Sequence, residues 1–265
     1  ERARIFLAAP LSAAEIETRF TGRIAEERLV AWDGRSETVQ ILRRRRLGAL
    51  ALAEQRDERA EPAAIAAALA EGIRQLGHAA LPWTPGARAL QARVLLLRRL
   101  WPERWPDLSD EALLADPLGW LGGRLGGMTR RAHLARLDLH AALLDRLDWQ
   151  QRRDLDRLAP THLPVPSGRQ VELDYTGEAP VLAVKLQELF GQRSTPSVAE
   201  GRVPVVVHLL SPAGRPVQVT RDLEGFWKTG YPAVRGELRG RYPRHPWPDD
   251  PLTAPPQRGT KKSGR

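Results

Sequence analysis

A long stretch with helical periodicity, placed between two stretches with strand patterns, limits the folds open to this chain. In residues 61–159, apolar side chains recur at helical spacing, and proline and glycine separate the runs. The clearest stripe, on a helix that Pro62 would begin, consists of Ile65, Leu69, Ile73 and Leu76. Further helices are expected after Thr84-Pro85, after Ser109, over His133–Leu147 and over Trp149–Leu158. Residues 61–159 therefore predict a helical domain.

The N-terminal segment, residues 1–60, is predicted to be strand-rich, and its first strand is expected over residues 4–11. The elements expected after it are a short helix over 13–23, a strand Leu29–Asp33, a turn at Asp33-Gly34 and a strand Thr38–Leu52. Together the two later strands would form a hairpin.

Four consecutive arginines, Arg43 to Arg46, lie within the second strand of that hairpin. Neighbouring side chains of a strand point to opposite faces, so at most two of the four can face one ligand. Arg44 and Arg46 share a face, and we take them as candidates for contacts with nucleic acid.

After Pro160 the pattern becomes strand-rich again and predicts an α+β domain over residues 160–252. The expected elements are strands His162–Val165, Val171–Tyr175, Val203–Leu210 and Val217–Thr220, and a helix Ala183–Phe190. Residues 253–265 contain few apolar side chains and predict a basic flexible tail. The chain is therefore assigned to the α+β class, with a strand-rich N-terminal unit, a helical middle and a C-terminal domain that combines a β-hairpin with helices.

The net charge of the chain is +9, and the position of this charge is more informative than its size. Arginine accounts for 37 of the 41 basic residues in a chain rich in alanine, leucine, glycine and proline. That bias is typical of a GC-rich coding sequence, so the arginine content alone is weak evidence of function. Residues 215–265 nevertheless hold 11 basic and 5 acidic residues, which places the positive charge at the C-terminal end.

The composition also bears on the cellular compartment. No apolar run approaches the length of a membrane span, no charged-then-apolar leader is visible, and the chain has no cysteine. We therefore expect a cytoplasmic protein with no membrane partner, no disulfide and no thiolate metal site. Because the chain starts at Glu1 and its only methionine is Met128, we also expect a fragment of a longer protein.

No set of catalytic side chains is visible in the sequence. The G-x-x-x-x-G-K-[ST] loop is absent, and Gly259–Gly264 lacks the strand and the helix that flank such a loop. Asp110–Leu113 resembles a DEAH box but opens an amphipathic helix. His245, Asp249 and Asp250 could hold a metal, although the prolines between them favour a solvated turn. We predict no catalytic residue, no metal site and no cofactor in this chain.

The densest functional signal is a helix expected to begin at an N-cap Thr220. Its buried face would consist of Leu223, Trp227, Tyr231, Val234 and Leu238. The opposite sector would present Arg221, Lys228, Arg235 and Arg239, a layout suited to phosphate contacts but also to a solvated face. Pro232 is expected to divide the helix and to lie in the first turn of its second piece.

Beyond this helix, aromatic rings and cations alternate in a proline-stiffened stretch. The candidates for nucleic-acid contacts here are Arg241, Tyr242, Arg244, His245 and Trp247. Bases can stack on such rings while the arginines contact phosphates. The alternative is that Tyr242 and Trp247 anchor an extended segment to the body of the domain.

Residues 209–251, LLSPAGRPVQVTRDLEGFWKTGYPAVRGELRGRYPRHPWPDDP, closely resemble the C-terminal signature of bacterial HrpB-type DEAH-box helicases of superfamily 2. The Lys261-Lys262 pair resembles the tail of that signature. Similar upstream segments, in the same order, are RIFLAAPL, RRRRLGALAL, LPWTPGARAL, DLSDEALL, APTHLPVPSGRQVELDY and APVLAVKLQELFG. The resemblance covers nearly all of the chain.

This resemblance implies an accessory region of an ATP-dependent RNA or DNA helicase. In the family, two RecA-like motor domains precede this region, and ATP and magnesium would bind there, so this chain would not be an enzyme alone. Its expected partners are single-stranded RNA or DNA and those motor domains. Accessory regions of DEAH-type helicases often include an oligonucleotide-binding-type barrel, and either strand-rich part of this chain is a candidate.

Two other functions stay open. The chain could be a family-specific interaction module that docks on the motor or on a partner protein, with the aromatic and basic cluster buried in that contact. An independent enzyme such as a nuclease is a third class, which would depend on Asp249 and Asp250.

Overall fold

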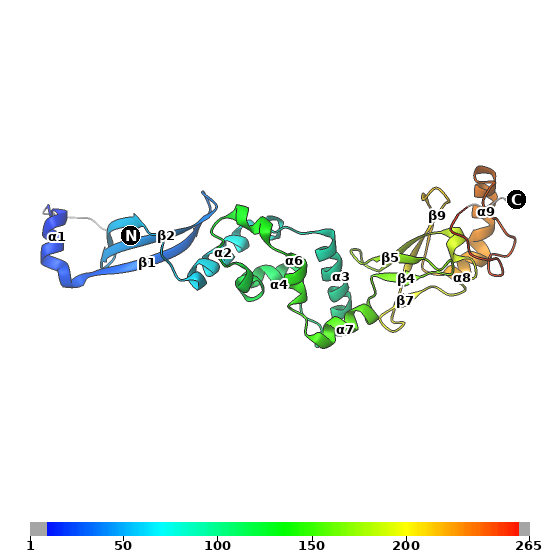
Figure 1. The fold of residues 1–265 in the computed structure, drawn as a ribbon, viewed down its shortest axis with the longest axis horizontal. Coiled ribbons are helices and arrows are strands. Elements are labelled where there is room, and N and C mark those ends of the chain that lie inside the picture. The colour runs from blue at the N-terminus through cyan, green and yellow to red at the C-terminus, as the bar shows by residue number, and fades with distance from the viewer. Residues whose placement is uncertain (1–9, 260–265) are drawn as a thin grey trace, which may run out of the picture. The chain divides into compact units, whose positions relative to one another are not determined.

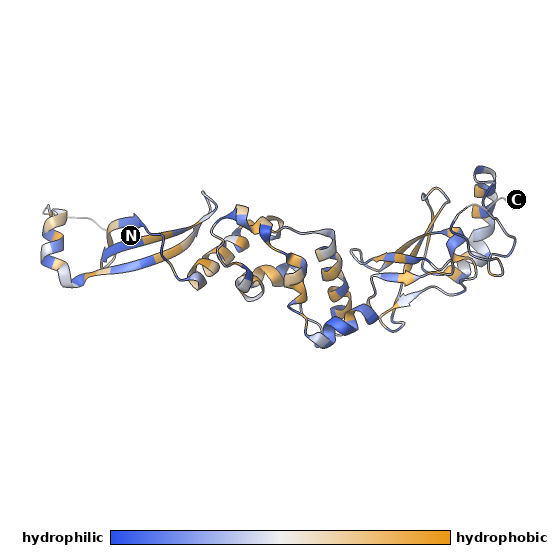
Figure 2. Ribbon diagram, viewed as in Figure 1, coloured by the Kyte–Doolittle hydropathy of each residue, from blue (hydrophilic) through white to orange (hydrophobic). Residues whose placement is uncertain are grey.

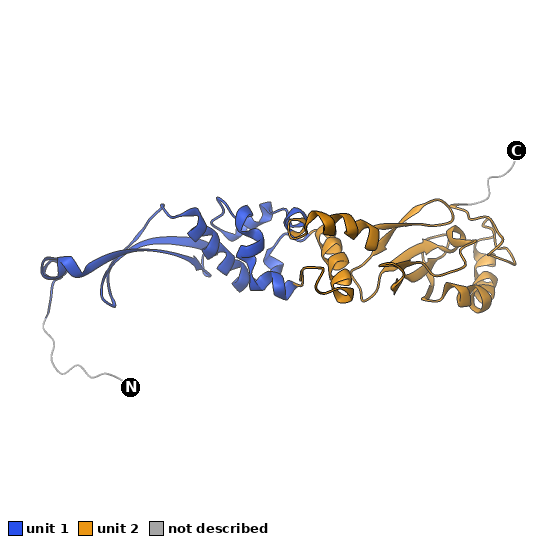
Figure 3. Cartoon of the chain, turned by 90° about the horizontal axis from the view of Figure 1, so that it is seen from below, with its two compact units in different colours: residues 1–83, 110–142 blue, residues 84–109, 143–265 orange. Residues whose placement is uncertain are grey.

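The structure is a computed structural model that describes residues 10–259. The strand expected over 4–11 lies almost wholly outside these residues, and the Lys261-Lys262 pair lies outside them too. The chain forms two compact units, of residues 1–83 with 110–142 and of residues 84–109 with 143–265 (Figure 3). The helical stretch 61–159 thus contributes to both units instead of forming one domain, because its helices pack on different partners.

Unit 1 is built on a three-stranded antiparallel sheet that follows helix α1 (Figure 1). Its elements are α1 (Ala13–Phe20), β1 (Ile24–Asp33), β2 (Thr38–Leu47) and β3 (Leu50–Arg56). The turn predicted at Asp33-Gly34 is confirmed, and the Asp33 carboxylate accepts hydrogen bonds from the Arg35 and Ser36 amides, both at 3.2 Å. Hydrophilic residues recur along β1 and β2 (Figure 2).

The single strand expected over Thr38–Leu52 is two strands, so that prediction was wrong. The chain reverses at Gly48, whose φ of 57° lies in the left-handed region that favours glycine. The helix expected over 13–23 likewise ends at Phe20 and continues as a 3₁₀ turn, Thr21–Arg23.

The helices of unit 1 pack on one another and, through α2, on β1. Their bounds are α2 (Pro62–Leu76), α4 (Asp110–Ala115), α5 (Pro117–Leu121), a 3₁₀ helix (Arg131–Arg136) and the start of α6 (Leu139–Leu144). The continuous helix expected over His133–Leu147 is therefore wrong. Asp138 interrupts it, because its carboxylate accepts a hydrogen bond from the Ala141 amide at 3.0 Å and starts α6 anew.

Unit 2 begins with α3 (Pro85–Leu100) and α7 (Trp149–Leu158), which contact each other. The predicted starts of both are confirmed: Thr84 caps α3 and Asp148 caps α7. The buried Arg93 links them, donating hydrogen bonds to the carbonyl oxygen of Ala159 at 2.6 Å and to the Asp156 carboxylate at 2.5 Å.

A five-stranded sheet in the order β10-β9-β6-β5-β4 forms the body of unit 2. Its strands are β4 (His162–Pro164), β5 (Gln170–Asp174), β6 (Val181–Lys185), β9 (Val206–Leu210) and β10 (Pro216–Thr220). Strands β6 and β9 are parallel, and the other neighbours are antiparallel. A separate pair is formed by β7 (Ser197–Val198) and β8 (Val203–Pro204), so the expected strand Val203–Leu210 changes partner part-way.

The helix expected over Ala183–Phe190 is wrong, because its first residues belong to β6. Leu182 and Val184 are buried on one face of the sheet, with Ala183 exposed between them. This alternation, together with hydrogen bonding to strands on both sides, overrides the helical propensity of the segment. Only a 3₁₀ turn, Leu186–Leu189, remains helical.

The C-terminal helices of unit 2 are α8 (Leu223–Gly225), a π-helical turn (Phe226–Gly230) and α9 (Tyr231–Arg241). The N-cap is Asp222, whose carboxylate accepts a hydrogen bond from the Gly225 amide at 2.9 Å; the prediction of Thr220 was wrong because that residue ends β10. Pro232 lies in the first turn of α9, as predicted. It has no amide hydrogen to donate, which accounts for the widened turn before it.

The α+β class predicted from the sequence is confirmed, and the oligonucleotide-binding-type barrel stays a prediction. No helix between residues 10 and 259 is long and apolar enough to cross a membrane.

Gly72 provides a test of the packing of unit 1. A Cβ atom at this position of α2 would overlap the Trp32 ring, which reaches the helix from β1. Gly72→Ala should therefore lower the free energy of unfolding by about 1 to 3 kcal/mol, measured by urea denaturation. The matched control is Gly236→Ala in α9, where the new methyl group meets nothing within 4 Å and should stabilise its helix. Equal effects of the two changes would contradict this account.

Candidate nucleic-acid interface

A cavity of about 760 Å³ lies beside α9 in unit 2. Its lining residues are Arg235, Gly236, Arg239, Gly240, Pro243, His245, Pro246, Trp247 and Asp249. Gly236 and Gly240 are one helical turn apart, and no atom lies within 4 Å of where their Cβ atoms would be. The helix backbone is therefore open to a ligand along this side.

The opposite wall of the cavity is the segment after α9, which side chains hold in place. Arg235 Nε donates to the carbonyl oxygen of Trp247 at 3.0 Å, and its guanidinium group lies 2.5 Å from the Asp249 carboxylate. Trp247 Nε1 donates to the carbonyl oxygen of Tyr242 at 2.9 Å. Burial raises the pKa of Tyr231 to about 12, so its hydroxyl keeps the proton that it donates to the carbonyl oxygen of Pro248.

These contacts assign structural roles to two of the candidate residues. Trp247 is only 9% exposed, so the structure favours the anchor alternative over base stacking for this ring. The charge of Arg235 is balanced by Asp249. Both residues shape the cavity, and its positive charge must come from other side chains.

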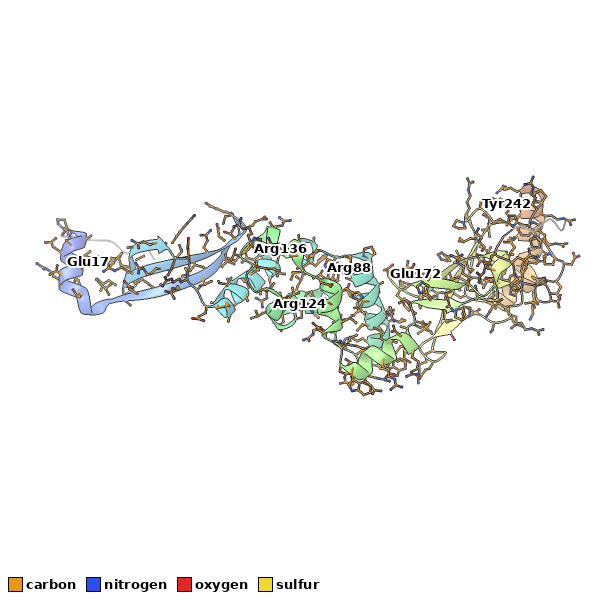
Figure 4. All side chains as sticks on the ribbon, viewed as in Figure 1. Glu17, Arg88, Arg124, Arg136, Glu172 and Tyr242 are labelled. Carbon is orange, nitrogen blue, oxygen red and sulfur yellow. The ribbon has the colours of Figure 1, made fainter. Side chains whose placement is uncertain are left out.

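Arg239 supplies positive charge to the cavity. It is exposed, and no ion pair with it occurs among residues 10–259. Arg244 is also exposed and has no ion pair in the same range, although it is not a lining residue. Tyr242, labelled in Figure 4, follows α9. Its ring packs edge to face on the His245 ring, with the two ring centroids 6.3 Å apart.

Lys185 is a cation that the sequence interpretation missed. Burial and the positive charge of Lys185 lower the pKa of His245, which lines the cavity, whereas Lys185 itself is not a lining residue. Lys185 ends β6, and it has no ion-pair partner in the part of the chain that the structure describes. The erroneous helix over Ala183–Phe190 concealed this position, whereas the alternating run that precedes Lys185 would have revealed the end of a strand.

The remaining candidates on the C-terminal helices lie outside the cavity lining. Lys228 and Arg241 each form an ion pair with a glutamate four residues earlier in the chain, Glu224 at 2.7 Å and Glu237 at 3.7 Å. Arg221 is exposed in the turn before α8. The structure therefore brings Arg235, Arg239, His245 and Trp247 together at the cavity. Arg221, Lys228 and Arg241 lie outside its lining.

Arg44 and Arg46 belong to unit 1, where carboxylates face them. Arg44 lies 2.6 Å from Glu54 and 3.6 Å from Glu27, and Arg46 lies 3.2 Å from Glu27. Glu27 is directly opposite Arg44 in the β1–β2 register. Cross-strand pairing thus balances much of the charge that made the arginine run a candidate.

The described residues provide no donor set for a metal ion. Within residues 10–259, no group of three histidine or carboxylate side chains could hold a metal ion. His245, Asp249 and Asp250 therefore do not form such a group. Asp110 begins α4, as expected of a helix start.

The part of the chain that contains strands β4 to β10 and the cavity is similar to a known protein family. Residues 120–251 match the family model HrpB_C, described as ATP-dependent helicase C-terminal. These residues belong to the HrpB C-terminal family. The resemblance predicted from the sequence is confirmed.

Relatives extend the similarity beyond these residues. The chain is 40% identical over 262 residues to the ATP-dependent RNA helicase HrpB of Escherichia coli K12, a match that covers 98% of the chain. A crystal structure of the E. coli DExH-box NTPase HrpB matches 97% of the chain with a TM-score of 0.75 and 39% identity. A second structure, of the E. coli DEAH/RHA helicase HrpB, matches 85% with a TM-score of 0.65 and 37% identity.

The chain spans about a third of the length of these relatives, since it covers 32% of the curated protein, 32% of the first structure and 29% of the second. It corresponds to the C-terminal region of an HrpB-type helicase.

Proposed function

We propose that the chain is a nucleic-acid-binding accessory region of an ATP-dependent helicase, and that unit 2 binds phosphates of a single strand at the cavity beside α9. In this proposal ATP and magnesium act in the RecA-like motor of the longer protein. The observation that supports it is the charge of the cavity. The lining residue Arg239 has no ion-pair partner in the described chain, whereas the lining carboxylate, Asp249, is already bound to Arg235. Lys185, whose charge acts on the lining residue His245, has no ion-pair partner in the described chain either.

Single-stranded RNA is the ligand we favour, because the E. coli relative is named an RNA helicase. The open backbone at Gly236 and Gly240 suits a sugar-phosphate chain, which needs close approach more than a deep pocket. Base identity would matter little at such a site.

The direct test is binding of fluorescently labelled single strands of about 20 nucleotides to the whole chain, followed by anisotropy. Because binding would release counterions, we expect affinity to fall steeply between about 50 and 200 mM salt. Absence of a complex at low salt would contradict the proposal.

A second candidate function is docking on the RecA-like motor or another protein. The aromatic side chains expected in such a contact are Trp227 and Trp247. Their exposed fractions are 5% and 9%, so neither ring is available at the surface of unit 2. Docking would have to use other side chains, and capture of the chain by a separately expressed motor would test it.

His245 should make binding dependent on pH. Burial and Lys185 lower its pKa, so the free imidazole is neutral near pH 7. A phosphate at the cavity would raise that pKa, and binding would then take up a proton. Affinity should therefore rise as the pH falls from about 7 to about 5, measured by anisotropy at constant salt.

The matched variant for the pH dependence is His245→Gln, which should bind with a flatter pH profile. The other charged groups at this wall are Lys185, Arg235, Arg239 and Asp249, and the variant keeps all of them. Identical profiles for the two proteins would exclude His245 as the responsible group.

A further inference from the structure

Trp149 is unusual among the eight tryptophans of the chain because its side chain is open to solvent. It is 70% exposed, whereas the others are buried or half-buried. An indole in this position forgoes the stabilisation that burial of a large aromatic surface provides. An exposed indole leaves its ring open to stacking by a ligand.

The backbone beneath Trp149 is firmly held. Trp149 is the first residue of α7, and Asp148 and Gln151 form a reciprocal capping box there. Asp148 accepts a hydrogen bond from the Gln151 amide at 2.7 Å, and the Gln151 side chain accepts one from the Asp148 amide at 2.8 Å. The Gln151 side chain also donates to the carbonyl oxygen of Arg104 at 2.7 Å. The indole therefore projects from a rigid base and not from a loose loop.

Arg153 lies on the same side of α7 as Trp149, four residues further along the helix. The other arginines of α7 are occupied: Arg152 donates to the carbonyl oxygen of Leu147 at 3.0 Å, and Arg157 lies 2.6 Å from Glu200. Neither Arg153 nor Arg146, in the turn before the helix, has an ion-pair partner between residues 10 and 259. An open indole is thus accompanied by two uncompensated cations.

We propose that Trp149 is a second contact for single-stranded nucleic acid, on which one base stacks while Arg153 and Arg146 contact the adjacent phosphates. This inference rests on the proposed function of unit 2. An aromatic face beside free guanidinium groups is complementary to a base attached to a phosphate. A protein partner would have to provide carboxylates for the same arginines.

The position of α7 within unit 2 determines how the two contacts can be used. Figure 1 shows helices α7 and α9 at opposite ends of this unit. A short oligonucleotide can reach only one of them, whereas a longer strand can reach both. The contribution of Trp149 should therefore increase with the length of the strand.

The experiment compares Trp149→Ala with the unchanged chain, using labelled polyuridine strands of about 6 and about 20 nucleotides. For the longer strand we expect the variant to bind on the order of ten-fold more weakly, with most of the affinity restored in Trp149→Phe. The control is Val219→Ala, which removes an exposed apolar side chain from β10 and should bind as the unchanged chain does.

Photo-crosslinking would identify the part of the protein that the strand contacts. A strand that carries halogenated uracil should crosslink to the peptide that contains Trp149, and Trp149→Ala should lose this product. Thermal denaturation of each variant separates a loss of binding from a loss of folding, and an exposed side chain should leave the transition unchanged.

Three outcomes would overturn the inference. If Trp149→Ala binds both strands normally while changes at Lys185 and Arg239 abolish binding, the second contact is wrong and the proposed function stands. If the unchanged chain binds no strand, both fail. If Trp149→Ala instead loses only its capture by a separately expressed motor, the partner of this surface is a protein.

Discussion

Replacing Trp227 by alanine is expected to lower the free energy of unfolding of unit 2 by about 3 to 5 kcal/mol. The Trp227 ring packs against Phe226, Tyr231 and Phe190, with centroid distances of 5.1, 5.6 and 6.3 Å. Its Nε1 atom also donates a hydrogen bond to the carbonyl oxygen of Gln192 at 2.7 Å. The substitution would leave a cavity among Phe190, Phe226 and Tyr231 and would remove that bond. A loss of this size is a large part of the stability of an ordinary domain.

The measurement is the midpoint of guanidinium denaturation, followed by circular dichroism. The matched control is Trp149→Ala, which removes the same side chain from an exposed position and should change stability by no more than about 0.5 kcal/mol. If both variants lost the same stability, the aromatic cluster would not be the centre of this packing.

The second large effect is expected from reversing the charge of the cavity. The double variant Lys185→Glu with Arg239→Glu should bind a strand of about 20 nucleotides roughly 100-fold more weakly at about 0.1 M salt. Two cations that have no partner in the described chain would become anions that repel phosphate. The slope of log affinity against log salt should fall by about two, one for each lost contact.

A control with the same change in total charge separates this site from a general electrostatic effect. Lys228→Glu with Arg241→Glu alters two cations that each already form an ion pair with a glutamate four residues away and that do not line the cavity. Its effect should be several-fold smaller at the same salt concentration. Equal losses in the two double variants would show that binding does not depend on the cavity.

Sequence patterns predicted those elements of the fold whose signals are local. Thr84, Asp148 and the Asp33-Gly34 turn mark boundaries through hydrogen bonds made within a few residues, and the structure places the boundaries there. The prediction was wrong at Ala183–Phe190, where an apolar segment is compatible with either helix or strand. Its state is decided by β5 and β9, which lie on both sides of β6 in the sheet.

The candidate site could be predicted only in part, for the same physical reason. The spacing of Arg235 and Arg239 shows that both lie along one helix, and the structure places both at the cavity. The sequence could not show that Asp249 neutralises Arg235, because the pair forms only when the chain turns back after α9. Likewise, Lys185 approaches His245 from a strand distant in sequence.

The segment that follows α9 has a consequence for how this surface can change during evolution. Its path is set by hydrogen bonds that Tyr231, Arg235 and Trp247 make to main-chain oxygens. Main-chain oxygens are present whatever the side chain, so residues such as Arg244 can be exchanged without loss of that path. The path of this segment and its exposed surface are thereby encoded by different positions.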